Sequence, residues 1–442
     1  MPTKIDFIGG NTKRCLMAMA LPMIAAMFLN MMYNLVDSLW IGNLLGKTAY
    51  AALTNSTPII LILTSVAMGA TNGVSILLSQ AIGAKDKKKA ESLIATSLCV
   101  AVTFSLLVTI LLEIFLPEIL KALNTPAETY DMAYSYLAIY ILGYLAVYLY
   151  LYFTAVLRSF GNSMFQALAM LVSTILNAIL DPIFIHFIGF HGAAIATLLS
   201  QMICLLFMLI YLKKKKLFTL KISAFNCNDV LLLIQKAIPS VIQQSIPAIS
   251  TTSLTALVST YSVTAIAAYG VTGKLETILF YPAMALNMVL TTIIGQCAGG
   301  ARYDRAKDYL KCALGYGGGL LVILSVLVVG FSKQLSGLFV RSSDVAVIVG
   351  TYYLIISIGY VLNTVTNCYL GALNGMGKPS KSLFWMIFYY IVVRIPLAYL
   401  LSYLGFGLNG IWVAVLVSHI VASLAATITG TVFIRKKGNI KA

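Results

Sequence analysis

Long apolar stretches, separated by short polar segments, run along the whole chain. Twelve of them are about 20 residues or longer, which is enough to cross about 30 Å of hydrocarbon as a helix. A closed β-barrel would instead show strands of about ten residues with alternating polarity, and that alternation is absent from the sequence. The pattern predicts an all-α membrane protein with twelve transmembrane helices, at about 14–39, 50–80, 92–116, 130–156, 163–187, 192–212, 233–258, 264–294, 309–331, 346–372, 382–404 and 409–434.

The second half of the chain repeats the first. Residues 79–84 match residues 295–300, which lie 216 positions later, and each segment is followed by a basic run and an alanine. A duplicated membrane chain usually places its working site between or within the two copies, so the repeat favours a transporter. Other pairs keep nearly the same shift: Pro22 with Pro239, Tyr136 with Tyr352, Gly143 and Tyr144 with Gly359 and Tyr360, and Gly192 with Gly410.

Charge supports this prediction and excludes nucleic-acid binding. The chain is 60% hydrophobic and only 10% charged, although its net charge is +16, whereas soluble domains carry about 25% charged residues. Lysine and arginine fall in alternate loops, including residues 85–89, 213–216 and 302–311. Because basic loops stay in the cytoplasm, we expect a multi-pass protein of the cell membrane with both termini cytoplasmic and two parallel repeats.

The repeat and the loops give the expected domains. Residues 1–212 form an amino-terminal six-helix lobe, residues 213–232 a cytoplasmic linker, and residues 233–442 a carboxyl-terminal six-helix lobe. The first apolar run has full length and no convincing cleavage site, so it is a span rather than a signal peptide.

Catalytic and metal-binding patterns are absent from the sequence. Its seven cysteines show no C-x-x-C spacing, which argues against a disulfide framework or a zinc site. We find no nucleophile–base pair, phosphate-cradling loop or H-E-x-x-H motif. The sequence therefore predicts no enzyme and no cofactor.

Two acids at membrane depth are the main candidates for chemistry. Asp37 shares a helical face with Asn30, Tyr33 and Asn34, and Asp181 follows Asn177 by one turn. Acids inside a span cost about 2.5–3.5 kcal/mol on insertion scales, so they need a wet cavity or a partner. Two carboxylates in one chamber cannot easily both ionise, and such a pair takes up a proton or admits a sodium ion. Thr197 on the sixth span adds a hydroxyl; the alternative is that both acids only hydrogen-bond to neighbouring helices.

A second group of charges lies in the other lobe. In one interpretation Glu276 reaches a central cleft and attracts a cationic solute there, and Arg394 is the partner of Glu276. In the other, Lys274 extends to an interface and Arg394 pairs with backbone carbonyls. Flexible methionines such as Met170 and Met284 suit a promiscuous apolar cavity, and they suit ordinary packing too. We predict a substrate cavity lined by Asn30, Tyr33, Asn34, Met170, Glu276 and Met284.

Prolines inside the spans are candidate hinges, because each removes a backbone hydrogen bond. Pro22 is the most informative of them, since it recurs as Pro239 and precedes Asp37 on the same span. The alternative is a static kink.

These motifs together resemble the MATE family, the multidrug and toxic compound extrusion transporters. The resemblance covers essentially the whole chain. It rests on the doubled Gln-x-x-Gly element at Gln80 and Gln296, on the Ala-Ala-Tyr-Gly run at 267–270 with Lys274-x-Glu276, and on Asn177-x-x-x-Asp181-Pro182. Asp37, Asn177 and Asp181 resemble the DinF-like branch, in which Asn30, Tyr33 and Thr197 match the polar positions of an amino-lobe chamber.

The resemblance implies a V-shaped pair of six-helix bundles, and we expect the protein to be a monomer. It implies export of cationic or amphipathic drugs by alternating access, in exchange for H⁺ or Na⁺ bound at Asp37, Asn177, Asp181 and Thr197, with a bend at Pro22. The alternative is a flippase of the same superfamily for lipid-linked oligosaccharides. A flippase cavity would display several cations at membrane depth, and this chain offers only Lys274 and Arg394.

Overall fold

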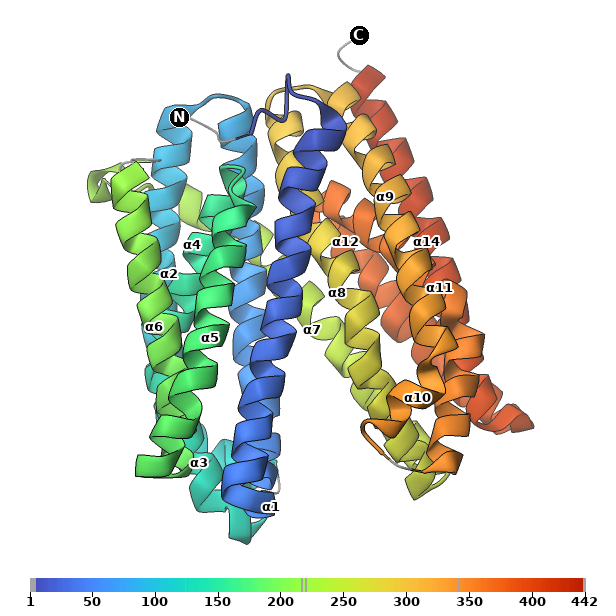
Figure 1. Ribbon diagram of the computed structural model, residues 1–442. Helices are drawn as coiled ribbons and strands as arrows, with labels where there is room; N and C mark the ends of the chain where they lie inside the picture. The colour runs from blue at the N-terminus through green and yellow to red at the C-terminus, as the bar shows by residue number, and fades with distance from the viewer. Residues whose placement is uncertain (1–4, 124, 216–217, 219–220, 341, 440–442) are drawn as a thin grey trace. The chain divides into compact units, whose positions relative to one another are not determined.

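The computed structural model describes residues 5–439 except 124, 216–217, 219–220 and 341. Every regular element in this part of the chain is a helix (Figure 1). The bounds are α1 Thr12–Gly83, α2 Lys87–Ala122, α3 Ala127–Leu142, α4 Tyr144–Ser159, α5 Ser163–Ile188, α6 Phe190–Lys215, η1 Ile222–Ala224, α7 Cys227–Ser259, α8 Val263–Gly299, α9 Tyr303–Gly330, α10 Ser332–Gly337, α11 Ser343–Gly375, α12 Pro379–Ile387, η2 Phe388–Arg394, α13 Ile395–Leu401, η3 Ser402–Phe406 and α14 Gly407–Asn439.

The apolar stretches have become helices because a helix satisfies its own backbone hydrogen bonds away from water. In the described part of the chain, eight helical segments are long and apolar enough to cross a membrane, or nine if the bent pair α3 and α4 is one span. Two of these segments are 72 and 56 residues long. At ~1.5 Å per residue each could cross ~30 Å twice. The all-helical membrane fold predicted from the sequence is confirmed.

Helix α1 contains two of the predicted spans in one element. Its backbone leaves helical geometry at Gly46, where φ is 80° and ψ is −168°. Only glycine adopts such a conformation readily. The sequence places the boundary between the first two spans in this region, and the structure shows that a single glycine makes it.

The internal repeat is visible in the backbone. Left-handed residues recur at matched positions after the repeat shift: Lys85 (φ 56°) with Ala301 (φ 58°), and Gly161 (φ 80°) with Gly377 (φ 77°). Lys85 and Ala301 are not glycine, so this conformation is uncommon for them. The two halves therefore share their turns as well as their sequence motifs.

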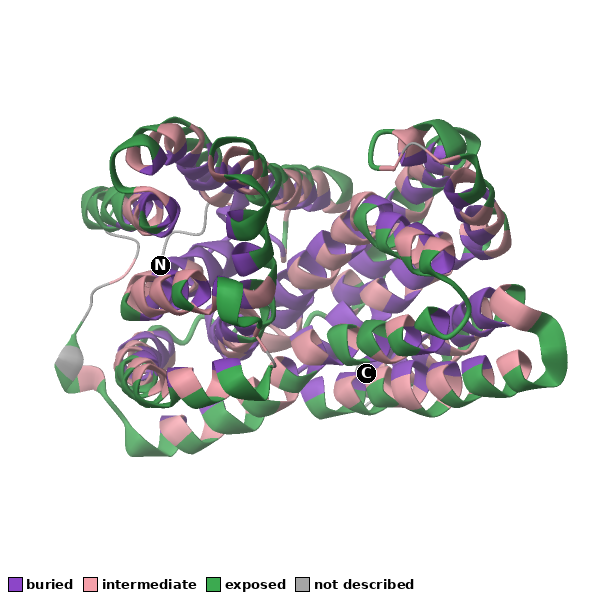
Figure 2. Ribbon diagram, turned by 90° about the horizontal axis from the view of Figure 1, so that it is seen from below, coloured by how far each residue is buried: buried purple, intermediate pink, exposed green. Residues whose placement is uncertain are grey.

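The chain divides into two compact units. One unit contains Leu21–Ala237, and the other combines Ile5–Ala20 with Ile238–Ala442. In the first unit α5 packs against α6, and in the second α11 packs against α8, α9 and α14. Each unit has its own apolar core, and Figure 2 shows buried residues on the inward faces of the helices within each unit. Of the predicted linker 213–232, residues 216–217 and 219–220 lie outside the described residues.

Candidate functional site

Asp37 and Asp181 come together inside the first unit. Asp37 lies on α1 with 8% of its surface exposed, and Asp181 lies on α5 with 0% exposed. The two carboxyl groups interact electrostatically, so the acids lie close to each other. Two negative charges at such a separation repel strongly in a medium of low dielectric constant. The pair is therefore a place where a proton or a cation is needed.

The residues next to Asp181 on α5 hold its side chain in position. Asn177 and Asp181 are one turn apart on α5, and the Asn177 Nδ2 atom donates to Asp181 Oδ1 at 2.9 Å. Pro182 follows directly and has no N–H for the carbonyl of Ala178. The helix thus holds the amide against the carboxylate where its own hydrogen bonding is interrupted.

Four buried oxygen atoms around this pair have no hydrogen-bond partner among the described residues. They are Asp37 Oδ1, Asp181 Oδ2, Asn177 Oδ1 and Thr197 Oγ1. A buried oxygen without a partner costs about 1–3 kcal/mol, and most buried polar groups in native structures have one. The four atoms lie on residues of α1, α5 and α6, and a shared proton or a small cation would fit them. They belong to the same four residues that the sequence singles out for ion coupling.

Tyr33 connects α1 to α6 next to the acids. Its hydroxyl lies 3.2 Å from Ser200 Oγ and 3.5 Å from the carbonyl oxygen of Thr197. Tyr33 also packs with Met170 of α5 in a small apolar cluster. Ser200 was not predicted as a site residue from the sequence, although Ser418 lies 218 positions later, the same shift that relates Gly192 to Gly410.

The predicted cavity residues of α1 differ in burial. Asn30 and Asn34 are exposed, while Tyr33 and Asp37 on the same arc of α1 are buried. The Asn34 Nδ2 atom donates to the backbone carbonyl of Asn30 at 2.8 Å. The polar face of α1 therefore has one buried edge and one exposed edge. Met284 is half-buried on α8, in the second unit.

Glu276 forms a separate cluster in the second unit. Its Oε1 atom accepts hydrogen bonds from Tyr352 at 2.6 Å and from Tyr360 at 2.8 Å. Both tyrosines lie on α11, and Trp412 of α14 packs edge-on against Tyr352. The tyrosines are repeat positions that the sequence shows, but their contact with the acid was not predicted.

Arg394 lies near this cluster on a π-helical segment, η2. Its Nε atom donates to Ser418 Oγ at 2.8 Å, its Nη2 atom lies 3.2 Å from His419 Nε2, and its guanidinium stacks on Tyr390. No carboxylate lies within 4.0 Å of it among the residues that the structure describes. π-Helical turns occur frequently at functional sites. Lys274 instead lies over the ring of Phe339, 5.4 Å from its centroid.

The donor set at Asp37 suits a small monovalent species. Across the described ranges no group of three or more His, Cys, Asp or Glu side chains could hold a metal ion. Two carboxylates with amide and hydroxyl oxygens fit a proton or a hard cation of low charge.

Similarity to known proteins identifies the family of this chain. The family model MatE matches residues 22–183 and again residues 239–400. The chain belongs to the MatE family. The two matches begin at Pro22 and Pro239, so the family's unit is the repeat seen in this sequence and structure. Members of the family are transporters and not enzymes, which confirms both the resemblance and the expectation that no catalytic centre is present.

Relatives of known description agree with the family. A Bacillus subtilis protein described as "Probable multidrug resistance protein YpnP" is 29% identical over 433 residues, covering 95% of each chain. A Shewanella oneidensis protein described as "FAD transporter" is 27% identical, covering 93% of each chain. The "Multidrug export protein MepA" of Staphylococcus aureus is 24% identical, covering 93% of this chain and 92% of its own. These matches show that the protein is a multi-pass transporter of the cell membrane that handles small molecules.

Solved structures show the same fold. An outward-facing multidrug resistance MATE transporter superposes with a TM-score of 0.94 at 22% identity, over 99% of each chain. A MATE protein crystallised in complex with MaL6 gives 0.91 at 23% identity, over 99% of this chain and 100% of the other. The predicted fold class is thereby confirmed.

Proposed function

We propose that this MatE transporter is an H⁺- or Na⁺-coupled antiporter of the DinF-like type, which exports cationic or amphipathic drugs by alternating access. The observation that carries the proposal is the set of four unpartnered oxygen atoms on Asp37, Asn177, Asp181 and Thr197. The multidrug descriptions of the relatives support the substrate class. The protein acts as a single chain in the cell membrane with both termini in the cytoplasm and needs no cofactor.

The ion acts on the carboxyl pair. One proton shared by Asp37 and Asp181, or one sodium ion held by the four oxygens, removes the repulsion between the two charges. Without that ion, the same chamber favours an organic cation. Drug and ion then stabilise different conformations, which is the requirement for exchange.

Helix α1 connects ion binding at Asp37 to a change of conformation. Asp37, Tyr33 and Pro22 all lie on α1, and Pro22 interrupts the backbone hydrogen bonds between the start of the helix and its acid. Binding of the ion at Asp37 bends the helix at Pro22 and lowers the affinity for the drug. Asn30, Asn34, Met170, Glu276 and Met284 remain our predictions for contacts to the drug.

Reconstituted protein tests the proposal. We expect a cationic dye to leave liposomes against its gradient when a pH gradient or a sodium gradient is imposed, and to stop when the gradient is dissipated. Running the two gradients separately identifies the ion. Dye movement that responds to neither gradient refutes the antiport mechanism.

A second candidate substrate class is a flavin nucleotide or another anion. Two observations favour it: the Shewanella relative described as an FAD transporter, and the buried guanidinium of Arg394, which has no carboxylate within 4.0 Å among the described residues. The same liposomes loaded with FAD separate the two classes, since an anion exporter moves FAD and leaves the dye. The flippase for lipid-linked oligosaccharides is less favoured, because the sequence offers only Lys274 and Arg394 as cations at membrane depth.

A further inference from the structure

The first helix belongs to both units. Its amino-terminal part, with the residues just before it, lies in the second unit as Ile5–Ala20, and from Leu21 onward it lies in the first. Pro22 is therefore one residue past the boundary. The start of α1 is held by one bundle while the part that carries Asp37 is held by the other.

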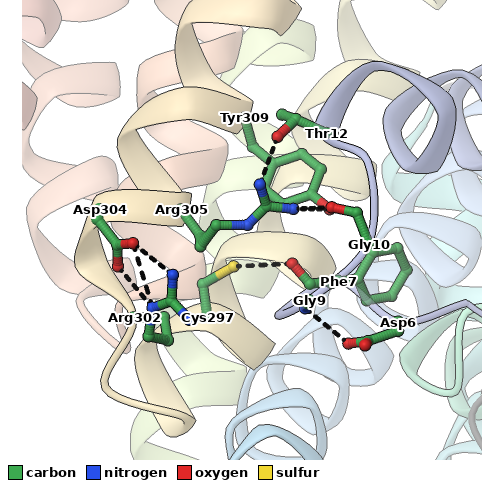
Figure 3. A network of polar contacts seen from close by, with 10 residues as sticks. All are labelled: Asp6, Phe7, Gly9, Gly10, Thr12, Cys297, Arg302, Asp304, Arg305 and Tyr309. Carbon is green, nitrogen blue, oxygen red and sulfur yellow. Dashed lines mark hydrogen bonds and ion pairs between the residues drawn. The ribbon is translucent and has the colours of Figure 1, made fainter.

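Arg305 of α9 is the polar centre of the contact that holds this starting segment (Figure 3). Its Nη1 atom donates to Thr12 Oγ1 at 2.7 Å, and its Nη2 atom donates to the carbonyl oxygen of Gly10. Phe7 packs edge-on against Tyr309, with 6.4 Å between ring centroids. The guanidinium of Arg305 also lies over the Tyr309 ring.

Helix α7 shows the reverse arrangement. Its first residues, up to Ala237, lie in the first unit, and from Ile238 onward it lies in the second, so the boundary falls just before Pro239. Asp229 at its start forms an ion pair with Lys89 of α2 and accepts a hydrogen bond from Ser92 at 2.7 Å. Asp229 is buried, with 1% of its surface exposed.

The two contacts are repeat counterparts. Lys89 and Arg305 are 216 positions apart, and Thr12 and Asp229 are 217 apart, which are the shifts that relate Gln80 to Gln296 and Pro22 to Pro239. A basic side chain after the Gln-x-x-Gly turn thus meets the start of a helix in each half. Hydrogen bonds to a charged group are the stronger kind.

We propose that these two contacts are permanent anchors, and that Arg305 and Asp229 are positioning residues for transport. Because each helix start moves with the opposite unit, any movement between the units must be absorbed at residues 20–22 and 237–239. Phe7, Leu16 and Met19 are buried, at 1%, 1% and 0% exposed. Exposing one such side chain costs roughly ten- to a hundredfold in equilibrium, so release in every cycle is disfavoured. This inference rests on the proposed alternating-access function.

Cross-linking distinguishes an anchor from a latch that opens. The pair Thr12→Cys and Arg305→Cys, in an active background without native cysteines, is joined by a short thiol-reactive linker. We expect this double variant to transport dye at the same rate with and without the linker, because the two positions stay together throughout the cycle. Loss of transport that returns when the linker is cleaved overturns the proposal.

Substitution at Arg305 tests the positioning role. We expect Arg305→Ala to lower dye turnover about tenfold, the size expected for losing a charge-assisted hydrogen bond, while equilibrium dye binding stays unchanged. Arg302→Ala is the matched control: Arg302 pairs with Asp304, three residues from the anchor, and its hydrogen bonds lower the pKa of that carboxyl. Equal turnover in the two variants overturns the proposal.

The repeat supplies a rescue. Arg305→Lys combined with Thr12→Asp recreates in the second unit the side chains of the Lys89–Asp229 contact, and we expect it to recover turnover in a protein that folds normally. If the dye turnover of this double variant is no higher than that of Arg305→Ala, the anchor proposal is wrong. If the unmodified protein itself shows no gradient-driven transport, the proposed function fails instead, so the two failures are distinguishable.

Discussion

Replacing either acid of the pair with its amide should uncouple transport from the ion gradient. Asp37→Asn and Asp181→Asn keep the shape of the side chain and remove its charge. The two carboxyl groups lie close together within the first unit, and we treat them as one site. In the proposed mechanism this site exchanges one proton or one sodium ion per cycle.

The proposed stoichiometry of one ion per drug gives the size of the effect. One ion per drug means that each pH unit, or each tenfold step of sodium, supports about a tenfold concentration ratio of drug, since one unit corresponds to ~1.4 kcal/mol. In the variants, the logarithm of the ratio should no longer depend on the gradient. The ratio should instead follow the membrane potential, which acts on a cation with ~2.3 kcal/mol per 100 mV.

Steady-state dye ratios in liposomes at several imposed gradients measure the slope. Asp131→Asn is the control, because this acid lies exposed on α3 of the same unit. We expect a slope of one decade per unit for the unmodified protein and the control, and a slope of zero for the two variants. A variant of Asp37 or Asp181 with an unchanged slope refutes the coupling role of the pair.

The remaining predictions concern stability, measured by thermal unfolding of the purified protein. Glu276→Gln should lower the melting temperature and cost about 1 kcal/mol, because the two tyrosine hydroxyls lose a charged acceptor; an unchanged melting curve contradicts these bonds. Gly192→Ala should destabilise the protein by about 1–3 kcal/mol, because a Cβ atom at this position would lie 2.2 Å from the carbonyl oxygen of Phe184. Gly270→Ala should leave the stability unchanged, because a Cβ atom there has nothing within 4 Å. Similar melting temperatures for the two alanine variants contradict the close packing of α5 and α6.

The sequence predicted the helices and the repeat well, because both depend on local patterns. Apolar stretches must form helices in lipid, and the shift of 216 positions is readable by eye. The four residues of the proposed coupling site could be picked out for a similar reason. Asn177 and Asp181 are one helical turn apart, and an acid within a span needs a reason to be there.

Other features depend on tertiary contacts and could not be predicted. Helical periodicity placed Asn30 and Asp37 on one face, but only packing against α5 and α6 decides which edge of that face is buried. Glu276 accepts hydrogen bonds from Tyr352 and Tyr360, which lie 76 and 84 positions later in the sequence. The crossing of α1 from one unit to the other leaves no sign in the sequence beyond the proline that follows it.

That crossing has a consequence for dissecting the protein. Neither half carries every segment of its own bundle, since the opening residues of α1 complete the carboxyl-terminal unit and those of α7 complete the amino-terminal one. The arrangement has the topology of a domain-swapped dimer fused into a single polypeptide. A fragment cut in the connection between the halves should be unstable by itself, and two co-expressed fragments should regain a folded protein by exchanging their ends.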